Sequence, residues 1–237
     1  MIDWTQQRVL ILSPHPDDEV IGCGGLISRV KDAGGQVFVN FVTLGDTRDR
    51  TERGLSTADE RITEIQKVAS QLAFDKWDVA LQGTEYHLRL DTMAQHDLIG
   101  VLEHASTLSL QAVEPTVVLL PSPLSYNQDH RAVAEAAITA LRPVGPTGDA
   151  RPVEIVAIFE EVADQWTPRS DVAPNLFVAL QQRHLDAKLD AMRAYVSQAR
   201  PHPHTRSLEA LQTMAVVRGA HSGLGYAEAY RCIRWLG

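Results

Sequence analysis

Hydrophobic side chains follow two spacings along the chain. Short, continuous runs of apolar and β-branched residues are typical of buried strands, and longer segments with apolar residues every three or four positions are typical of amphipathic helices. The predicted strands are 8–13, 36–44, 78–81, 116–120, 154–161 and 175–180; the predicted helices are 20–33, 57–73, 91–110, 129–141, 182–198 and 207–218, with a short further helix at the C-terminal end.

This alternation of strands and helices favours one architecture. It predicts an α/β fold with a Rossmann-like, predominantly parallel sheet and helices on both faces. With 237 residues, 44% of them hydrophobic, the chain is long enough to bury a large core. The Pro- and Gly-rich stretch 143–152 is expected to be a surface loop rather than a linker, because a strand-like segment follows at once. We therefore expect residues 1–237 to form a single domain.

Charge and composition narrow the classes of function. The formal net charge of −8 disfavours nucleic acid and anionic membrane surfaces as partners. The first residues lack the pattern of a secretory signal, and no stretch is long and apolar enough for a membrane span, so we expect a cytoplasmic protein. Cys23 and Cys232 show no pairing pattern, so that a metal site here must rely on His and carboxylate ligands.

A dense group of polar residues, Ser13-Pro14-His15-Pro16-Asp17-Asp18-Glu19, follows the first predicted strand. In an open parallel sheet this is the carboxyl end of a strand, the edge where ligands bind. One imidazole and two carboxylates supply two metal ligands and leave one carboxylate as a base. Capping of the next helix by an Asp is the alternative, but a cap accounts for one acid only and leaves His15 unexplained.

A catalytic zinc typically takes three protein ligands and keeps a fourth position for water. The sequence offers the third ligand in Asn127-Gln128-Asp129-His130, which also follows a predicted buried strand and precedes a helix. Two strand ends of one parallel sheet point into the same crevice, which favours a ligand role for His130 over a surface or capping role.

These residues resemble the signatures of the PIG-L/LmbE-like N-deacetylases. His15 to Glu19 followed by Gly24-Gly25 is similar to the family's His-Pro-Asp-Asp-Glu and Gly-Gly, and Asn127 to His130 is similar to its His-x-Asp-His. Weaker similarities run through most of the chain, at Arg61 with Glu64, Leu90-Asp91, Ser197-Gln198 and Tyr226 to Tyr230.

The resemblance implies a role for each matching residue, with Zn²⁺ or another divalent metal as the cofactor. The implied metal ligands are His15, Asp18 and His130, the implied general base is Asp17, and the implied substrate contacts are Arg61 and Asp91.

One departure from the family pattern affects the expected chemistry. Asn127 stands where the family has the first His of His-x-Asp-His, a residue associated with the tetrahedral intermediate or the leaving amine. An Asn amide donates a hydrogen bond to an oxyanion but cannot deliver a proton near neutral pH. Acid catalysis then falls to Asp17, once protonated, with Tyr126 as a helper unless that side chain only packs. Asp129, without the His it normally orients, is left to orient a metal ligand.

The expected reaction is hydrolysis of an acetamide by metal-activated water. The resemblance implies a small-molecule substrate, an N-acetylated amino sugar in a glycoside, a glycolipid, or a natural-product or thiol precursor. Two alternatives remain open: an amidase that removes a larger acyl group, and a non-catalytic sugar-binding module, to which the Asn127 departure lends weight. A nucleotide-binding oxidoreductase is disfavoured because Gly22-x-Gly24-Gly25 lacks the dinucleotide spacing. The sequence is silent on oligomeric state, so a homo-oligomer stays open.

Overall fold

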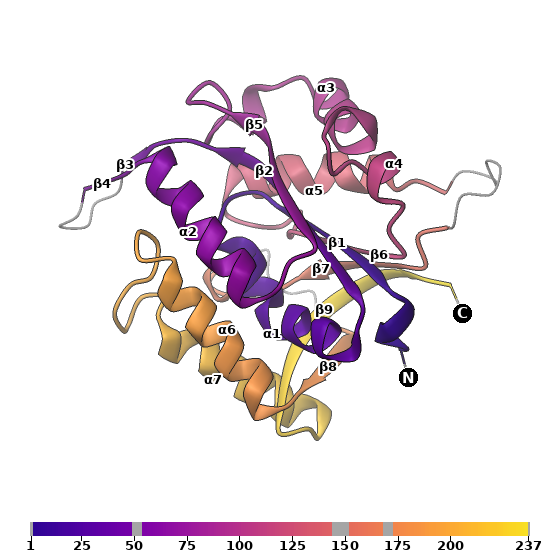
Figure 1. Cartoon of the computed structure of the whole chain (residues 1–237), viewed down its shortest axis with the longest axis vertical. Helices are drawn as coiled ribbons and strands as arrows, with labels where there is room; N and C mark the ends of the chain where they lie inside the picture. The colour runs from indigo at the N-terminus through magenta and orange to yellow at the C-terminus, as the bar shows by residue number, and fades with distance from the viewer. Residues whose placement is uncertain (1, 49–53, 144–151, 168–172, 237) are drawn as a thin grey trace.

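The computed structural model describes residues 2–48, 54–143, 152–167 and 173–236. A seven-stranded sheet in the order β5-β2-β1-β6-β7-β9-β8 forms its centre (Figure 1). Its strands are β1 (Arg8–Ser13), β2 (Gln36–Leu44), β5 (Lys76–Gln82), β6 (Val117–Leu120), β7 (Ile155–Phe159), β8 (Leu176–Leu180) and β9 (Tyr226–Trp235). The longer helices are α1 (Asp18–Ala33), α2 (Ala58–Gln71), α5 (Gln128–Ala140), α6 (Gln182–Ala194) and α7 (Leu208–Ser222).

The sheet is predominantly parallel, as the sequence predicts. β1 pairs in parallel with β2 and β6, β2 with β5, and β6 with β7, while β9 runs antiparallel between β7 and β8. The carboxyl ends of five parallel strands therefore meet at one edge. Loops that leave this edge are brought together whatever their separation in sequence.

Helices cover both faces of the sheet (Figure 1). Alternate residues of β1 divide between two cores, because successive side chains of a strand point to opposite faces. Val9 and Ile11 pack in the core that contains residues of α1, α2, α6 and α7, whereas Leu10 and Leu12 pack in the core under α5 and its neighbours. Within the described residues, no helix combines the length and apolar character that crossing a membrane requires.

The long helix predicted for 91–110 is wrong. The segment instead contains η2 (Leu90–Thr92), α3 (Gln95–Gly100), the π-helical turn η3 (Val101–Ala105) and α4 (Leu110–Val113). Ser109 caps α4 by accepting the Ala112 amide, and the buried Asn40 of β2 donates to Ser106 Oγ and to the Leu108 carbonyl. These side chains satisfy backbone groups that a continuous helix would use, so helical periodicity alone overestimated its length.

The short C-terminal helix is also wrong, since Tyr226–Trp235 forms β9. Ala and Glu favour helices in isolation, but β9 lies between β7 and β8 and its backbone is paired on both sides. A small antiparallel pair, β3 (Thr47–Arg48) with β4 (Leu55–Ser56), was not predicted. The predicted loop 143–152 falls largely outside the described residues.

Candidate metal centre and active site

A cavity of about 350 Å³ lies at the carboxyl edge of the sheet. Residues that follow β1, β2, β5, β6 and β7 all line it. His15, Asp17 and Asp18 follow β1, Tyr126, Asn127 and His130 follow β6, and Thr47, His87 and Glu161 follow β2, β5 and β7. The wall is completed by Arg61 of α2 and by Gln198, His204 and Arg206 from the segment between α6 and α7.

The turn between β1 and α1 is held in place by buried polar contacts. Asp17 has φ of 116°, a left-handed conformation that strains a residue with a side chain. The buried Glu19 carboxylate accepts the Asp17 amide at 3.0 Å and the Tyr195 hydroxyl at 2.5 Å. Arg61 donates to the Pro16 carbonyl at 2.9 Å. α1, α2 and the chain after α6 thus fix the position of Asp17 together.

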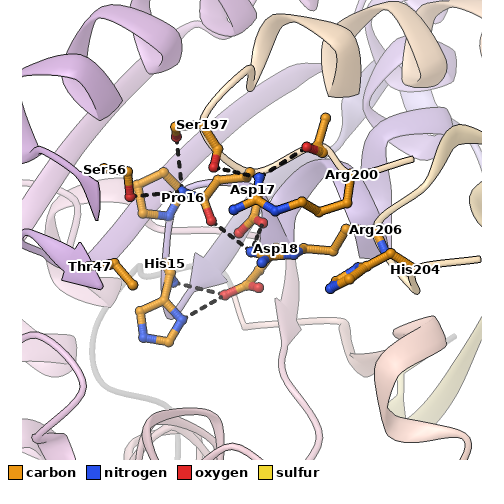
Figure 2. Close-up of polar contacts among 12 residues, drawn as sticks. His15, Pro16, Asp17, Asp18, Thr47, Ser56, Ser197, Arg200, His204 and Arg206 are labelled. Atoms are coloured by element: carbon orange, nitrogen blue, oxygen red, sulfur yellow. Dashed lines mark hydrogen bonds and ion pairs between the residues drawn. The ribbon is translucent and has the colours of Figure 1, made fainter. Parts of the chain in front are cut away.

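The three residues predicted as metal ligands converge on the floor of the cavity. Asp18 Oδ2 lies 3.4 Å from Nδ1 of His15 and 3.2 Å from Nε2 of His130. One ligand atom from each of the three lies within 4.8 Å of the others, and all three residues are buried. Figure 2 shows the His15 ring turned toward the Asp18 carboxylate.

Asp129 reaches His15 from the other side. Its Oδ2 lies 3.0 Å from His15 Nε2, and its Oδ1 accepts the Leu90 amide at 3.0 Å. A carboxylate on one ring nitrogen fixes the proton there and leaves the other nitrogen as a lone pair for a cation. In its neutral form His15 therefore has its lone pair on Nδ1, the nitrogen that lies 3.4 Å from Asp18 Oδ2.

Charges in this cluster shift one another strongly. Burial opposes the charge of His15, but the carboxylates of Asp129 and Asp18 override it and raise the pKa of His15 to about 9. Burial likewise opposes the charge of Asp18, yet the neighbouring His130 and His15 hold its pKa well below its usual range. The buried carboxylates of this cluster therefore favour a positive charge beside them, which either protons on the imidazoles or a metal cation can supply.

Asp17 lies beside the candidate metal ligands with a different charge balance. Burial and the adjacent Asp18 raise the pKa of Asp17 to about 6, against the opposing charges of Arg206 and Arg61. Arg206, which Figure 2 shows near Asp17, lies 3.4 Å from Asp17 Oδ2. It also donates to Gln198 Oε1 at 2.6 Å. A carboxylate with a pKa close to neutrality is suited to accept a proton and to return it.

Asn127 lines the cavity and caps α5. Its Oδ1 accepts the Asp129 amide at 3.0 Å, so the group that remains for the cavity is the donor NH₂. Tyr126 lines the same cavity, and burial of its hydroxyl with the charge of Glu161 raises its pKa to about 12. Both side chains are hydrogen-bond donors near neutral pH.

The two predicted substrate contacts lie apart. Arg61 is buried and lines the cavity, with its guanidinium 3.3 Å from Thr47 Oγ1 and 3.2 Å from His87 Nε2. Asp91 is exposed on η2 and lines a separate cavity with Gln128 and Arg131. The structure therefore brings Arg61, but not Asp91, to the candidate active site.

Sequence reasoning missed Glu161 and His87. Glu161 Oε1 lies 3.4 Å from Nδ1 of His130, and burial with the charges of Asp18 and Asp164 raises its pKa well above the usual range. His87 packs edge-on against His15 with ring centroids 5.2 Å apart. His87 follows β5 and Glu161 follows β7, so both come after the carboxyl end of a parallel strand, as His15 and His130 do. A search for polar residues after every parallel strand would therefore have found them.

The family is decided by comparison of the sequence with known families. The PIG-L family, described as GlcNAc-PI de-N-acetylase, matches residues 10–141, which span both candidate metal-ligand segments. This chain belongs to the PIG-L family. The matched region begins within β1 and extends through α5, whereas Glu161 and Arg206 lie beyond it.

Relatives of the chain include named deacetylases. It is 28% identical over 236 residues to a diacetylchitobiose deacetylase of Thermococcus kodakarensis, covering 96% of this chain and 83% of that protein. It is also 28% identical over 150 residues to a 2'-N-acetylparomamine deacetylase of Streptomyces fradiae, covering 59% of this chain and 54% of that protein.

The fold is shared with a protein of another activity. The structure of the 4-carboxy-2-hydroxymuconate hydratase of Pseudomonas putida KT2440 matches with a TM-score of 0.75 at 21% identity, over 98% of both chains. This fold therefore carries more than one chemistry, and the residues of the site, not the fold, determine which reaction a protein catalyses.

Proposed function

We propose that this chain is a zinc-dependent N-deacetylase that removes the acetyl group from an N-acetylated amino sugar. The observation that carries the proposal is the convergence of His15, Asp18 and His130 at the floor of the cavity, with Asp17 beside them. Membership of the PIG-L family and the named deacetylases among the relatives support it.

The donor set fits a zinc ion. Ligands about 2.0–2.2 Å from a tetrahedral zinc lie roughly 3.3 Å from one another. The distances from Asp18 Oδ2 to His15 and to His130, 3.4 and 3.2 Å, agree with such an arrangement. Two His nitrogens and one carboxylate oxygen also form a common ligand set of catalytic zinc. We assign Asp129 and Glu161 as the carboxylates that orient His15 and His130.

The residues of the chain divide the remaining chemistry. A bound divalent cation lowers the pKa of water and polarises an amide carbonyl. Asp17 accepts the proton of the attacking water, and its pKa of about 6 leaves it ionised at neutral pH. Arg206 helps to position the Asp17 carboxylate, from which its guanidinium lies 3.4 Å away. The NH₂ group of Asn127 is the donor for the oxyanion that forms from the acetamide carbonyl.

The leaving amine needs a proton that Asn127 cannot deliver. Asp17 carries one after the attack on the carbonyl, so the same carboxyl returns it to the nitrogen. Tyr126 donates a hydrogen bond in this step but keeps its proton, because a pKa of about 12 makes the phenol a poor acid. One carboxyl group therefore acts first as base and then as acid.

The substrate class follows from the relatives and the cavity. The names of two relatives give diacetylchitobiose and 2'-N-acetylparomamine as their substrates, and both compounds contain an acetamido sugar. A polar cavity of about 350 Å³ with Arg61, Thr47 and Gln198 in its wall has the donors and acceptors that sugar hydroxyls require. Because residues between 161 and 166 and between 198 and 206 supply part of this wall, we propose that residues 1–237 work as one deacetylase domain.

The test is acetate and free-amine release from N-acetylglucosamine, N,N'-diacetylchitobiose and matched long-acyl analogues, with zinc and with a chelator. The proposal expects release from acetyl substrates that the chelator abolishes and zinc restores. Preference for long acyl chains would identify the amidase alternative. Binding of the sugars by the zinc-loaded protein without any release would identify a non-catalytic module.

A further inference from the structure

Two large aromatic rings stand exposed at the same cavity as the candidate metal ligands. The exposed fraction is 52% for Tyr126 and 73% for Trp166, and the value of Trp166 is the highest among the large hydrophobic residues that the structure describes. Both line the cavity that contains His15 and His130. Their ring centroids lie 6.3 Å apart at an interplanar angle of 48°. The mechanism above uses the Tyr126 hydroxyl but neither aromatic face.

The loops that carry these rings are fixed to each other. The Asp164 carboxylate accepts the Ser125 hydroxyl at 2.7 Å and the Tyr126 amide at 3.3 Å. Asp164 ends η4 (Val162–Asp164), two residues before Trp166. From α5, Arg131 donates to the carbonyls of Ser125 and Tyr126, both at 2.8 Å. Loops that are fixed in this way bring two exposed aromatic rings together at one cavity, and contiguous exposed apolar surface at a cavity is typical of a ligand-binding groove.

We propose that Tyr126 and Trp166 form a stacking subsite for a second sugar ring, the one joined to the acetamido sugar that reacts at the floor of the cavity. A pyranose ring is polar at its edge and apolar on its C–H faces, so it needs hydrogen bonds around it and an aromatic surface against one face. The floor of the cavity supplies the first kind of contact and the aromatic pair supplies the second. This inference rests on the proposed function and adds to it that the substrate is at least a disaccharide.

The alternative occupant of an exposed aromatic pair is a protein partner. Continuity with the polar cavity favours the sugar, since the two rings line the same cavity as Asp17, Arg61 and Gln198. A protein-binding patch is typically a broad surface with an apolar centre rather than the wall of a charged cavity of this size.

The test compares monosaccharide and disaccharide in the full-length, zinc-loaded protein. We expect Trp166→Ala to lower the ratio of kcat/KM for N,N'-diacetylchitobiose to that for N-acetylglucosamine roughly three- to tenfold, mainly through KM of the disaccharide. Trp166→Phe should restore most of the ratio. The control is Trp235→Ala, because Trp235 is also 52% exposed but pairs with Ile155 at the start of β7, at the opposite edge of the sheet.

A binding measurement separates this inference from the proposed function. Calorimetric titration with both sugars needs no turnover, and the inference expects the disaccharide to bind more tightly, with the difference lost in Trp166→Ala. If the sugars are hydrolysed but Trp166→Ala leaves the ratio and the difference in affinity as in the wild type, the subsite is refuted and the deacetylase stands. If nothing is hydrolysed but the difference in affinity depends on Trp166, the deacetylase is refuted and the subsite stands. Equal affinity of the wild type for the two sugars also overturns the subsite.

Discussion

The Asp129 carboxylate lies 3.0 Å from Nε2 of His15, although 114 residues separate the two in sequence. The contact joins the two motifs of the candidate metal centre, because Asp129 directly precedes the candidate ligand His130 and contacts the candidate ligand His15. We therefore expect removal of this carboxylate to weaken metal binding, although Asp129 is not itself a proposed ligand.

We expect Asp129→Ala to lower the affinity for zinc by about ten- to a hundredfold, the usual loss when a carboxylate behind a ligating His is removed. A competition titration with a chromogenic chelator measures this affinity. Asp129→Asn keeps one acceptor for His15 and should lose less. An affinity of Asp129→Ala equal to that of the wild type would show that His15 does not depend on Asp129.

Glu161 is predicted to serve His130 in the same way. Its Oε1 is 3.4 Å from His130 Nδ1, so Glu161→Leu should weaken zinc binding about tenfold or more, measured by the same competition. The matched control is Glu160→Gln, since Glu160 pairs with Arg218 at 2.7 Å instead. Equal losses in both variants would contradict a specific role for Glu161.

Substitution of the proposed general base and substitution of a proposed metal ligand should affect different quantities, namely kcat and zinc content. Asp17→Asn removes the proton acceptor but no ligand, so we expect zinc content to be kept while kcat falls roughly a hundred- to ten-thousandfold. His130→Ala should lower the zinc content itself, measured by atomic emission. Loss of zinc to the same degree in both variants would contradict this division of roles.

Zinc binding should release protons and weaken as the pH falls. The pKa of His15 is raised to about 9 in the absence of a cation, so this imidazole is protonated at neutral pH and zinc must displace its proton. Affinity is therefore expected to rise with pH until about 9 and then to level off. Calorimetry in buffers of different ionisation enthalpy counts the protons released, and a count of zero at neutral pH would refute the shift.

A further prediction concerns stability. The buried Glu228 of β9 accepts the amides of Gly25 and Leu26 in α1, the helix that begins at Asp18, and pairs with Lys188 of α6 at 2.6 Å. Glu228→Ala leaves the buried Lys188 ammonium with the Ile21 carbonyl but without a counter-charge, so the free energy of unfolding should fall by about 3–5 kcal/mol. The double variant with Lys188→Met removes the unpaired charge and should recover part of the loss. Urea denaturation measures both.

The local pattern of the sequence was sufficient for most of the architecture. β1 and β2 begin and end where the apolar runs do, and the predominantly parallel sheet with helices on both faces follows from their alternation. The cluster His15 to Glu19 was visible because its residues are adjacent. The carboxyl-edge rule then indicated that Asn127 to His130 would face it, since parallel strands place their ends together.

Only the tertiary structure decided the contacts between distant segments. Tyr226–Trp235 forms a strand because β7 and β8 pair with it on both sides, and the helix expected over 91–110 is interrupted where the remote Asn40 donates to the Leu108 carbonyl. The spacing of apolar residues along the chain indicates which face of a helix or strand is buried. It does not indicate which distant residue will contact that face. For the same reason Trp166 lines the cavity and Asp91 does not, because the packing of their loops is not encoded in any local pattern.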